Sequence, residues 1–109
     1  MIPFHESKAA NLFNEIGVKN PVATQLRSQV MRMITRMIKS KSLTQHQIAS
    51  QLHLTQPQVS YLMNGKLSKF SLERLFEILN DLHRNVNITV GDAKRRQLGR
   101  TQIKELAHP

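Results

Sequence analysis

Residues 55–61 bring uncharged hydrogen-bonding side chains together on a short stretch of the chain. The stretch holds two glutamines, a serine and a tyrosine, whose amide and hydroxyl groups can both donate and accept hydrogen bonds. An ordinary exposed face of a helical hairpin would carry charged residues instead. Because glutamine pairs well with adenine in the major groove, the chemistry that this stretch favours is hydrogen bonding to base edges. The residues concerned are Gln56, Gln58, Ser60 and Tyr61.

Two short segments with the same start signal would position these side chains. Thr44 stands three residues before Gln47, and Thr55 stands three residues before Gln58. This is the capping-box spacing, in which the threonine hydroxyl and the glutamine amide bind backbone groups of the first helical turn. An apolar residue before each threonine and another four residues after it fit a hydrophobic staple. The sequence therefore predicts two helices, one beginning next to each threonine.

A helix-turn-helix needs two such helices to cross steeply around a short turn. Ala49 can supply the small residue where the backbones meet, and residues 53–55 can form the turn. Gly65 is free to take the left-handed conformation that ends the second helix. We therefore predict a helix-turn-helix over about residues 44–64. The apolar residues that would wedge its helices together are Ile48, Leu52, Leu54, Val59 and Leu62.

Helical spacing also predicts the elements around this motif. Residues 21–40 carry an apolar stripe and follow Asn20 as a cap, and a further helix begins at Ser71. Residues 7–16 can form a short helix that stops at Gly17. We expect both stripes, methionines included, to be core. They consist of Leu26, Val30, Met33, Ile34, Met37 and Ile38 in the long helix and of Leu72, Leu75, Phe76, Leu79 and Leu82 in the last.

The chain after the last helix changes character. Residues 85–90 alternate polar and apolar side chains and include three β-branched Val or Ile, which predicts a strand. The basic tail that follows could contact DNA or an acidic protein, or could simply keep the protein in solution. The predicted organisation is a segment with a short helix over 1–20, a helix-turn-helix domain over 21–84, a strand over 85–90 and a flexible basic tail over 91–109.

The formal net charge is +9, and the charges are unevenly spread. No Asp or Glu occurs between Ile16 and Leu72, whereas acids gather at Glu73, Glu77 and Asp81. A surface without acids suits a polyanion, because a carboxylate beside a phosphate weakens binding. A solvated basic surface that binds nothing is the alternative. The cations of the acid-free stretch are Lys19, Arg27, Arg32, Arg36, Lys39, Lys41, Lys66 and Lys69.

Composition excludes several classes of site. The absence of cysteine rules out disulfides, thiol catalysis and cysteine-based zinc sites, and it fits a cytoplasmic protein. The histidines are scattered without metal-ligand spacing, so we expect no metal and no cofactor. No catalytic set can be assembled, so we expect no enzyme. No apolar run approaches the ~20 residues of a membrane span, and the N-terminus does not read as a signal peptide.

The stretch LTQHQIASQLHLTQPQVSYLMNGK, residues 43–66, resembles the helix-turn-helix of the XRE, or lambda-repressor-like, family. The likeness extends over residues 12–90 and is greatest with HigA-like antitoxin components of toxin–antitoxin pairs, whose N-termini resemble residues 13–18. It implies a mainly α, lambda-repressor-like helical bundle with a short C-terminal β-strand. One departure is His53, which stands where many members have the glycine that a positive φ favours.

The resemblance also implies a role for each matched residue. Thr44 and Gln45, at the start of the first short helix, would bind a DNA phosphate. Asn64 and Lys66 would bind the backbone after the second helix, and we add Lys69 to this phosphate-binding set. The side chains that would face the major groove and read bases are Thr55, Gln56, Gln58, Ser60 and Tyr61.

The expected partners are double-stranded DNA with a palindromic operator, a second copy of the chain and a toxin. Because a lone strand leaves its backbone groups unpaired, we expect two copies to pair antiparallel at residues 85–90, with Val86, Ile88 and Val90 over a shared core. Pairing with residues 1–5 is the rival arrangement, which would leave a monomer.

Two other functions stay open. A stand-alone or phage-type repressor would bind DNA without any toxin, and a small basic toxin gene next door would argue against it. A protein-interaction module would bind no DNA. It would favour acidic or apolar residues on the outward face of the second short helix, and that face carries glutamines instead.

Overall fold

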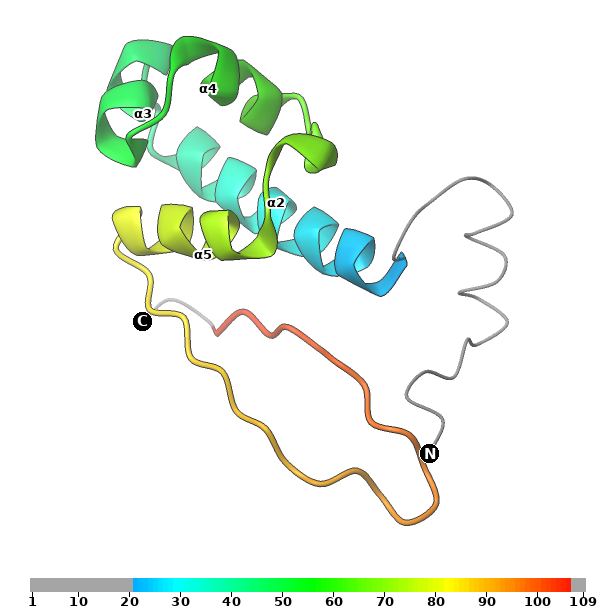
Figure 1. The fold of residues 1–109 in the computed structure, drawn as a ribbon. Coiled ribbons are helices and arrows are strands. Elements are labelled where there is room, and N and C mark those ends of the chain that lie inside the picture. The colour runs from blue at the N-terminus through cyan, green and yellow to red at the C-terminus, as the bar shows by residue number, and fades with distance from the viewer. Residues whose placement is uncertain (1–20, 107–109) are drawn as a thin grey trace.

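The computed structural model describes residues 21–106, and this part of the chain is mainly helical (Figure 1). The element order is α2 (Pro21–Ser40), α3 (Gln45–Leu52), α4 (Gln56–Met63), the 3-10 helix η1 (Leu67–Lys69) and α5 (Leu72–Asp81). The four predicted helices of this region are thereby confirmed. The helix predicted at residues 7–16 and the cap at Asn20 lie outside the described residues.

Helices α2 and α5 pack against each other, and α3 and α4 lie together on one side of this pair (Figure 1). The core forms where these layers meet. Every residue of the predicted α2 stripe is buried except Leu26, which is half-buried, so the methionines do belong to the core. Burial of each such side chain contributes on the order of 1.5–3 kcal/mol relative to exposure. This core fixes α3 and α4 on a rigid base.

Helix α5 presents its apolar side to the same core. Leu75 and Leu79 are buried as predicted, and Leu82 is buried just after the helix ends. Ile78, which the sequence analysis left out of the stripe, is fully buried between them. Leu72 and Phe76 are only half-buried and pack against the edge of the core. The acids of α5, Glu73, Glu77 and Asp81, lie outside this buried stripe.

The starts of the helices follow from their side-chain caps. Thr44 and Thr55 each form the predicted capping box, with both the hydroxyl and the glutamine bond present. At α5 the hydroxyl of Ser71 accepts from the backbone N–H of Arg74 at 3.1 Å. Gly65 has φ +70°, the left-handed conformation expected after α4. These caps satisfy backbone donors that a helix end would otherwise leave unpaired.

The prediction of a strand at residues 85–90 is wrong for the single chain, because no strand forms within residues 21–106. Among these described residues the segment has no neighbouring strand to pair with. Of its three apolar side chains, Val86 is half-buried against the core, whereas Ile88 and Val90 are 74% and 91% exposed. Alternation of side chains permits a strand, yet only a hydrogen-bonded partner makes one.

Residues 85–102 form an exposed arm that leaves the end of α5, turns and runs back towards the helices (Figure 1). The N–H of Gln97 donates to the carbonyl of Lys94 at 3.0 Å, which marks the turn. Residues 103–106, the docked end, return to α2: Gln29 Nε2 donates to the carbonyl of Ile103 at 2.6 Å. Ile103 also packs against the core. The described part of the predicted basic tail is thus anchored at its C-terminal end, residues 103–106.

Candidate nucleic-acid interface

The helix-turn-helix consists of α3, a turn over residues 53–55 and α4. His53 ends α3 in the left-handed region, with φ 54° and ψ 44°, and its N–H bonds the carbonyl of Ala49. The N–H of Leu54 also donates to that carbonyl, at 3.0 Å. Ala49 itself is half-buried against the core, as the predicted small contact requires. The sharp reversal is therefore set by one positive φ and by two hydrogen bonds to one carbonyl.

Helix α4 has a buried side and a polar side. Val59 and Leu62 are fully buried and hold the helix on the core. Gln56, Gln58 and Ser60 are exposed on the other side. The packing of α4 on α2 and α3 leaves this polar side directed away from the rest of the molecule. An α-helix presented in this way can enter the major groove of DNA.

The capping box occupies part of this polar side. The Thr55 hydroxyl accepts from the N–H of Gln58 at 3.2 Å, and Gln58 Oε1 accepts from the N–H of Thr55 at 2.9 Å. Gln58 therefore keeps its amide NH₂ for another acceptor. Among residues 21–106 the side chain of Gln56 has no hydrogen-bond partner, so both ends of its amide are available. Of the base-reading candidates, Gln56 is the least committed within the fold.

Tyr61 lies at the edge of the polar side, where it is half-buried against the core. The ammonium group of Lys69 stands 5.0 Å from the centroid of the Tyr61 ring, within the range of a cation–π contact. The structure thus brings together one residue predicted to read bases and one predicted to bind phosphate. A phosphate near this corner would meet a cation that is already positioned by the aromatic ring.

The remaining phosphate candidates lie at two helix ends. Thr44 and Gln45 are exposed at the start of α3. Lys66 is exposed in the loop after α4. Asn64 Nδ2 bonds the carbonyl of Ser60 at 2.9 Å and its hydroxyl at 3.2 Å, so this amide secures the end of α4 and leaves Oδ1 outward. Helix starts and cations of this kind are common phosphate contacts.

Arg74 supports the turn and was missed by the sequence analysis. It extends from α5, and its Nη2 donates to the carbonyls of Leu52 and His53 at 3.2 and 3.4 Å. Its Nη1 donates to Glu77 Oε2 at 2.9 Å. The guanidinium therefore binds carbonyls that the end of α3 leaves open. No local sequence signal marks this contact, because it spans 22 residues of chain.

The charges of the described region follow the predicted division. From residue 21 to Ser71 there is no acid, so none lies on α3 or α4. Glu73, Glu77 and Asp81 all belong to α5. Within residues 21–106 no group of three or more His, Asp or Glu side chains could hold a metal ion. The surface around α3 and α4 thus offers cations and uncharged hydrogen-bonding groups to a partner.

Comparison with known proteins places this geometry in a family. A family model described as a helix-turn-helix domain matches residues 12–91, most of the chain. The chain belongs to this helix-turn-helix family. A solved structure named as an XRE family transcriptional regulator is 30% identical to the helix-turn-helix protein, with a TM-score of 0.73. The match covers 83% of this chain and 100% of that one.

Two further findings concern curated relatives and membrane-spanning helices. No curated protein matches the chain closely enough to count as a relative. None of the helices in the described part of the helix-turn-helix protein is both long and apolar enough to cross a membrane.

Proposed function

We propose that this helix-turn-helix protein is a sequence-specific transcription regulator that inserts α4 into the major groove of DNA. The observation that carries the proposal is the polar side of α4. It presents uncharged amides and a hydroxyl, is held on the core by Val59 and Leu62, and has no acid on the neighbouring α3. Such groups suit base edges, whereas the cations around them suit phosphates. The similar XRE family regulator supports the same function.

Selection of duplexes from a random library would test this proposal. We expect the wild-type protein to enrich one motif, and the Gln56→Ala variant to lose preference at a single base pair of it. A footprint on the upstream region of the gene would then show whether the protein binds its own promoter. Enrichment of no motif at all, with a folded protein, would contradict the proposal.

The phosphate contacts have a separate test. Replacing Lys66 by alanine should weaken binding to all duplexes alike and lower the slope of log affinity against log salt by about one unit. The Lys39→Ala variant is the control, because it also removes one positive charge but at an exposed residue outside the predicted phosphate-binding set. An unchanged slope in the Lys66 variant would remove that residue from the interface.

The proposal includes an antitoxin role. It rests on the resemblance of residues 13–18 and of the helix-turn-helix to HigA-like antitoxins, which repress their own operon and neutralise a toxin. Co-expression with the product of the neighbouring reading frame is the test. A small basic protein that is toxic alone and harmless together with this chain would support the role. The absence of any such neighbour would favour the stand-alone or phage-type regulator.

A further inference from the structure

The arm, residues 85–102, carries the most basic stretch of the described region, and the proposed function does not use it. Four cations lie between residues 94 and 100, against one acid, Asp92, in the whole arm. Within residues 21–106 none of these four cations has an ion pair or a side-chain hydrogen bond, although Arg36, Arg74 and Arg84 each pair with a glutamate. The four are Lys94, Arg95, Arg96 and Arg100.

The arm is held in place at both ends, so its tip, residues 94–100, contains a closed turn and is not a free chain end. Near its base, Asn80 Nδ2 donates to the carbonyl of Arg84 at 2.9 Å. At the docked end, Glu105 pairs with Arg36 of α2, and Arg84 Nη1 lies 3.9 Å from the other oxygen of the same carboxylate. Arg36 and Arg84 thereby neutralise Glu105, so this carboxylate does not compensate the cations of the arm.

The tip presents its cations on a tight turn. Arg96 has φ 61°, the left-handed region, and the bond from the N–H of Gln97 to the carbonyl of Lys94 closes the turn around it. All residues from 91 to 100 are exposed. Because the turn fixes neighbouring cations side by side, a partner meets a preformed charged surface and orders less chain on binding.

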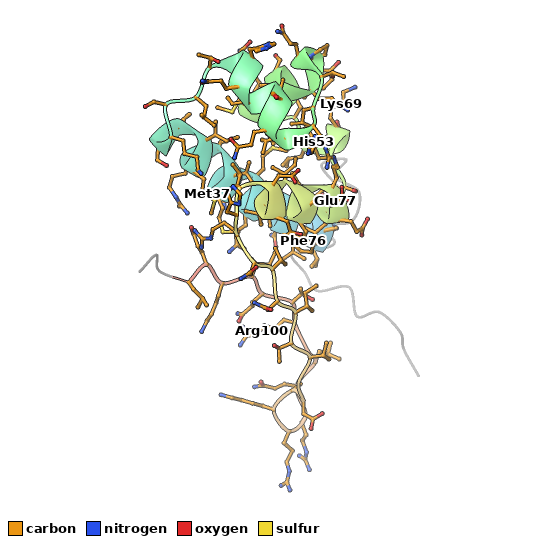
Figure 2. All side chains as sticks on the ribbon, turned by 90° about the vertical axis from the view of Figure 1, so that its left-hand side faces the viewer. Met37, His53, Lys69, Phe76, Glu77 and Arg100 are labelled. Carbon is orange, nitrogen blue, oxygen red and sulfur yellow. The ribbon has the colours of Figure 1, made fainter. Side chains whose placement is uncertain are left out.

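The tip lies far from α4. In Figure 1 the arm leaves on the side of α5 opposite to α3 and α4, and in the view turned by 90° Arg100 again lies beyond α5 from His53 and Lys69 (Figure 2). An extended run over residues 85–94 can reach up to about 30 Å at ~3.3 Å per residue. The arm tip therefore does not face the duplex that α4 would read.

We propose that the arm tip is a second, sequence-independent binding site for duplex DNA, so that one protein joins two duplex segments. The chemistry of the tip favours a phosphate backbone over an acidic protein. Stable protein interfaces have clustered apolar or aromatic anchors at their centre, whereas residues 94–100 hold four cations and a single large apolar side chain, Leu98, which is 68% exposed. Phosphates need no such anchor, because the release of counterions drives their binding to cations.

This inference rests on the proposed function, in which α4 binds one duplex, and adds a second duplex bound by the arm tip. A bead-bound duplex saturated with the full chain should capture a labelled random-sequence duplex. The Arg95→Gln/Arg96→Gln variant should lose most of this capture, expressed per protein on the bead, and its salt slope on random duplex should fall by about two units. The Lys39→Gln/Lys41→Gln variant removes equal charge from exposed residues outside the arm and should keep the capture.

Three outcomes would overturn the second site. In the first, capture of the second duplex persists in the arm variant. In the second, capture falls equally in both variants, which would make the loss an effect of net charge. The arm variant could also lose binding to vesicles of anionic lipid while it keeps duplex capture, which would identify a membrane as the partner. Sedimentation of both variants shows whether a change in oligomeric state explains the result. Library selection tests α4 independently, so failure of the arm and failure of the proposed function give different results.

Discussion

His53, in the turn of the helix-turn-helix, has a backbone conformation that L-residues rarely adopt. Its φ of 54° lies in the region that costs an L-residue roughly 1–2 kcal/mol and glycine almost nothing. We expect His53→Gly to raise the free energy of unfolding by about 0.5–1 kcal/mol, because the relief of strain exceeds the extra freedom of glycine in the unfolded chain. Urea unfolding of the two proteins measures the difference.

His46 provides the matched control for this change. It is an exposed histidine of α3 with helical backbone, where glycine should lower stability by roughly 0.3–0.5 kcal/mol relative to histidine, the difference between their helix propensities. Opposite signs for two His→Gly changes seven residues apart would identify backbone conformation as the cause. A loss of stability in both variants would mean that the His53 side chain contributes more than its strain removes.

Substitution of the two glutamines of α4 can distinguish an effect on base discrimination from an effect on stability. Gln56→Ala should reduce discrimination at one base pair by about 1–3 kcal/mol without lowering stability, because the Gln56 side chain binds nothing else among the described residues. Gln58→Ala should lose discrimination and also about 1 kcal/mol of stability, because Gln58 Oε1 caps the helix. Competition binding and thermal melting measure the two effects.

A carboxylate at residue 58 gives a sharper comparison. Gln58→Glu keeps the capping box, since glutamate serves there as well as glutamine, but it places a negative charge beside the phosphates. We expect this variant to be as stable as the wild type and to bind DNA much less. Equal DNA affinity in the glutamate variant and the wild type would show that this side of α4 does not approach DNA.

At the scale of elements, Arg74 joins α5 to the end of α3. Arg74→Ala should lower the free energy of unfolding by about 1–2 kcal/mol, because two carbonyls of the turn lose a charged donor. Glu77→Ala removes the exposed ion pair alone and should cost no more than about 0.5 kcal/mol. Urea denaturation of both variants distinguishes these values. Equal losses would assign the stability to the ion pair and not to the turn.

The elements that the sequence predicts well are those with local signals. Both capping boxes and the glycine after α4 lie within a few residues of the groups that they bind, so their spacing is visible in the chain. The contact of Arg74 depends on how α5 packs and could not be read from spacing. Residues 85–90 show the opposite error, because alternation indicates which side chains share a face but not whether another strand lies beside them.

The candidate site divides in the same way. The polar side of α4 was predicted because Val59 and Leu62 define its buried side by helical period. The half-buried ring of Tyr61 and its contact with Lys69 were not, since they depend on where η1 places the lysine. Local rules therefore predicted which side of α4 is polar and exposed, whereas tertiary packing decides which of its side chains remain free.

At the scale of the whole molecule, the unpaired arm base bears on the oligomeric state. Residues 85–90 are extended and expose Ile88 and Val90, and no other segment of residues 21–106 pairs with their backbone. Two copies related by a two-fold axis could pair these segments antiparallel and cover the apolar side chains. The same axis would place two α4 helices about 34–36 Å apart, one turn of DNA, as a palindromic operator requires.

We therefore predict that the wild-type protein sediments as a dimer at micromolar concentration and that Ile88→Pro shifts it to the monomer, because proline removes a backbone donor from the pairing. Leu98→Pro, on the returning run of the arm, is the matched control: its side chain is also exposed, at 68%, and the dimer should persist. Since the core does not include Ile88, melting of the monomeric variant should still be cooperative. A wild-type monomer, or an Ile88→Pro variant that remains a tight dimer, would show that residues 85–90 do not join two copies.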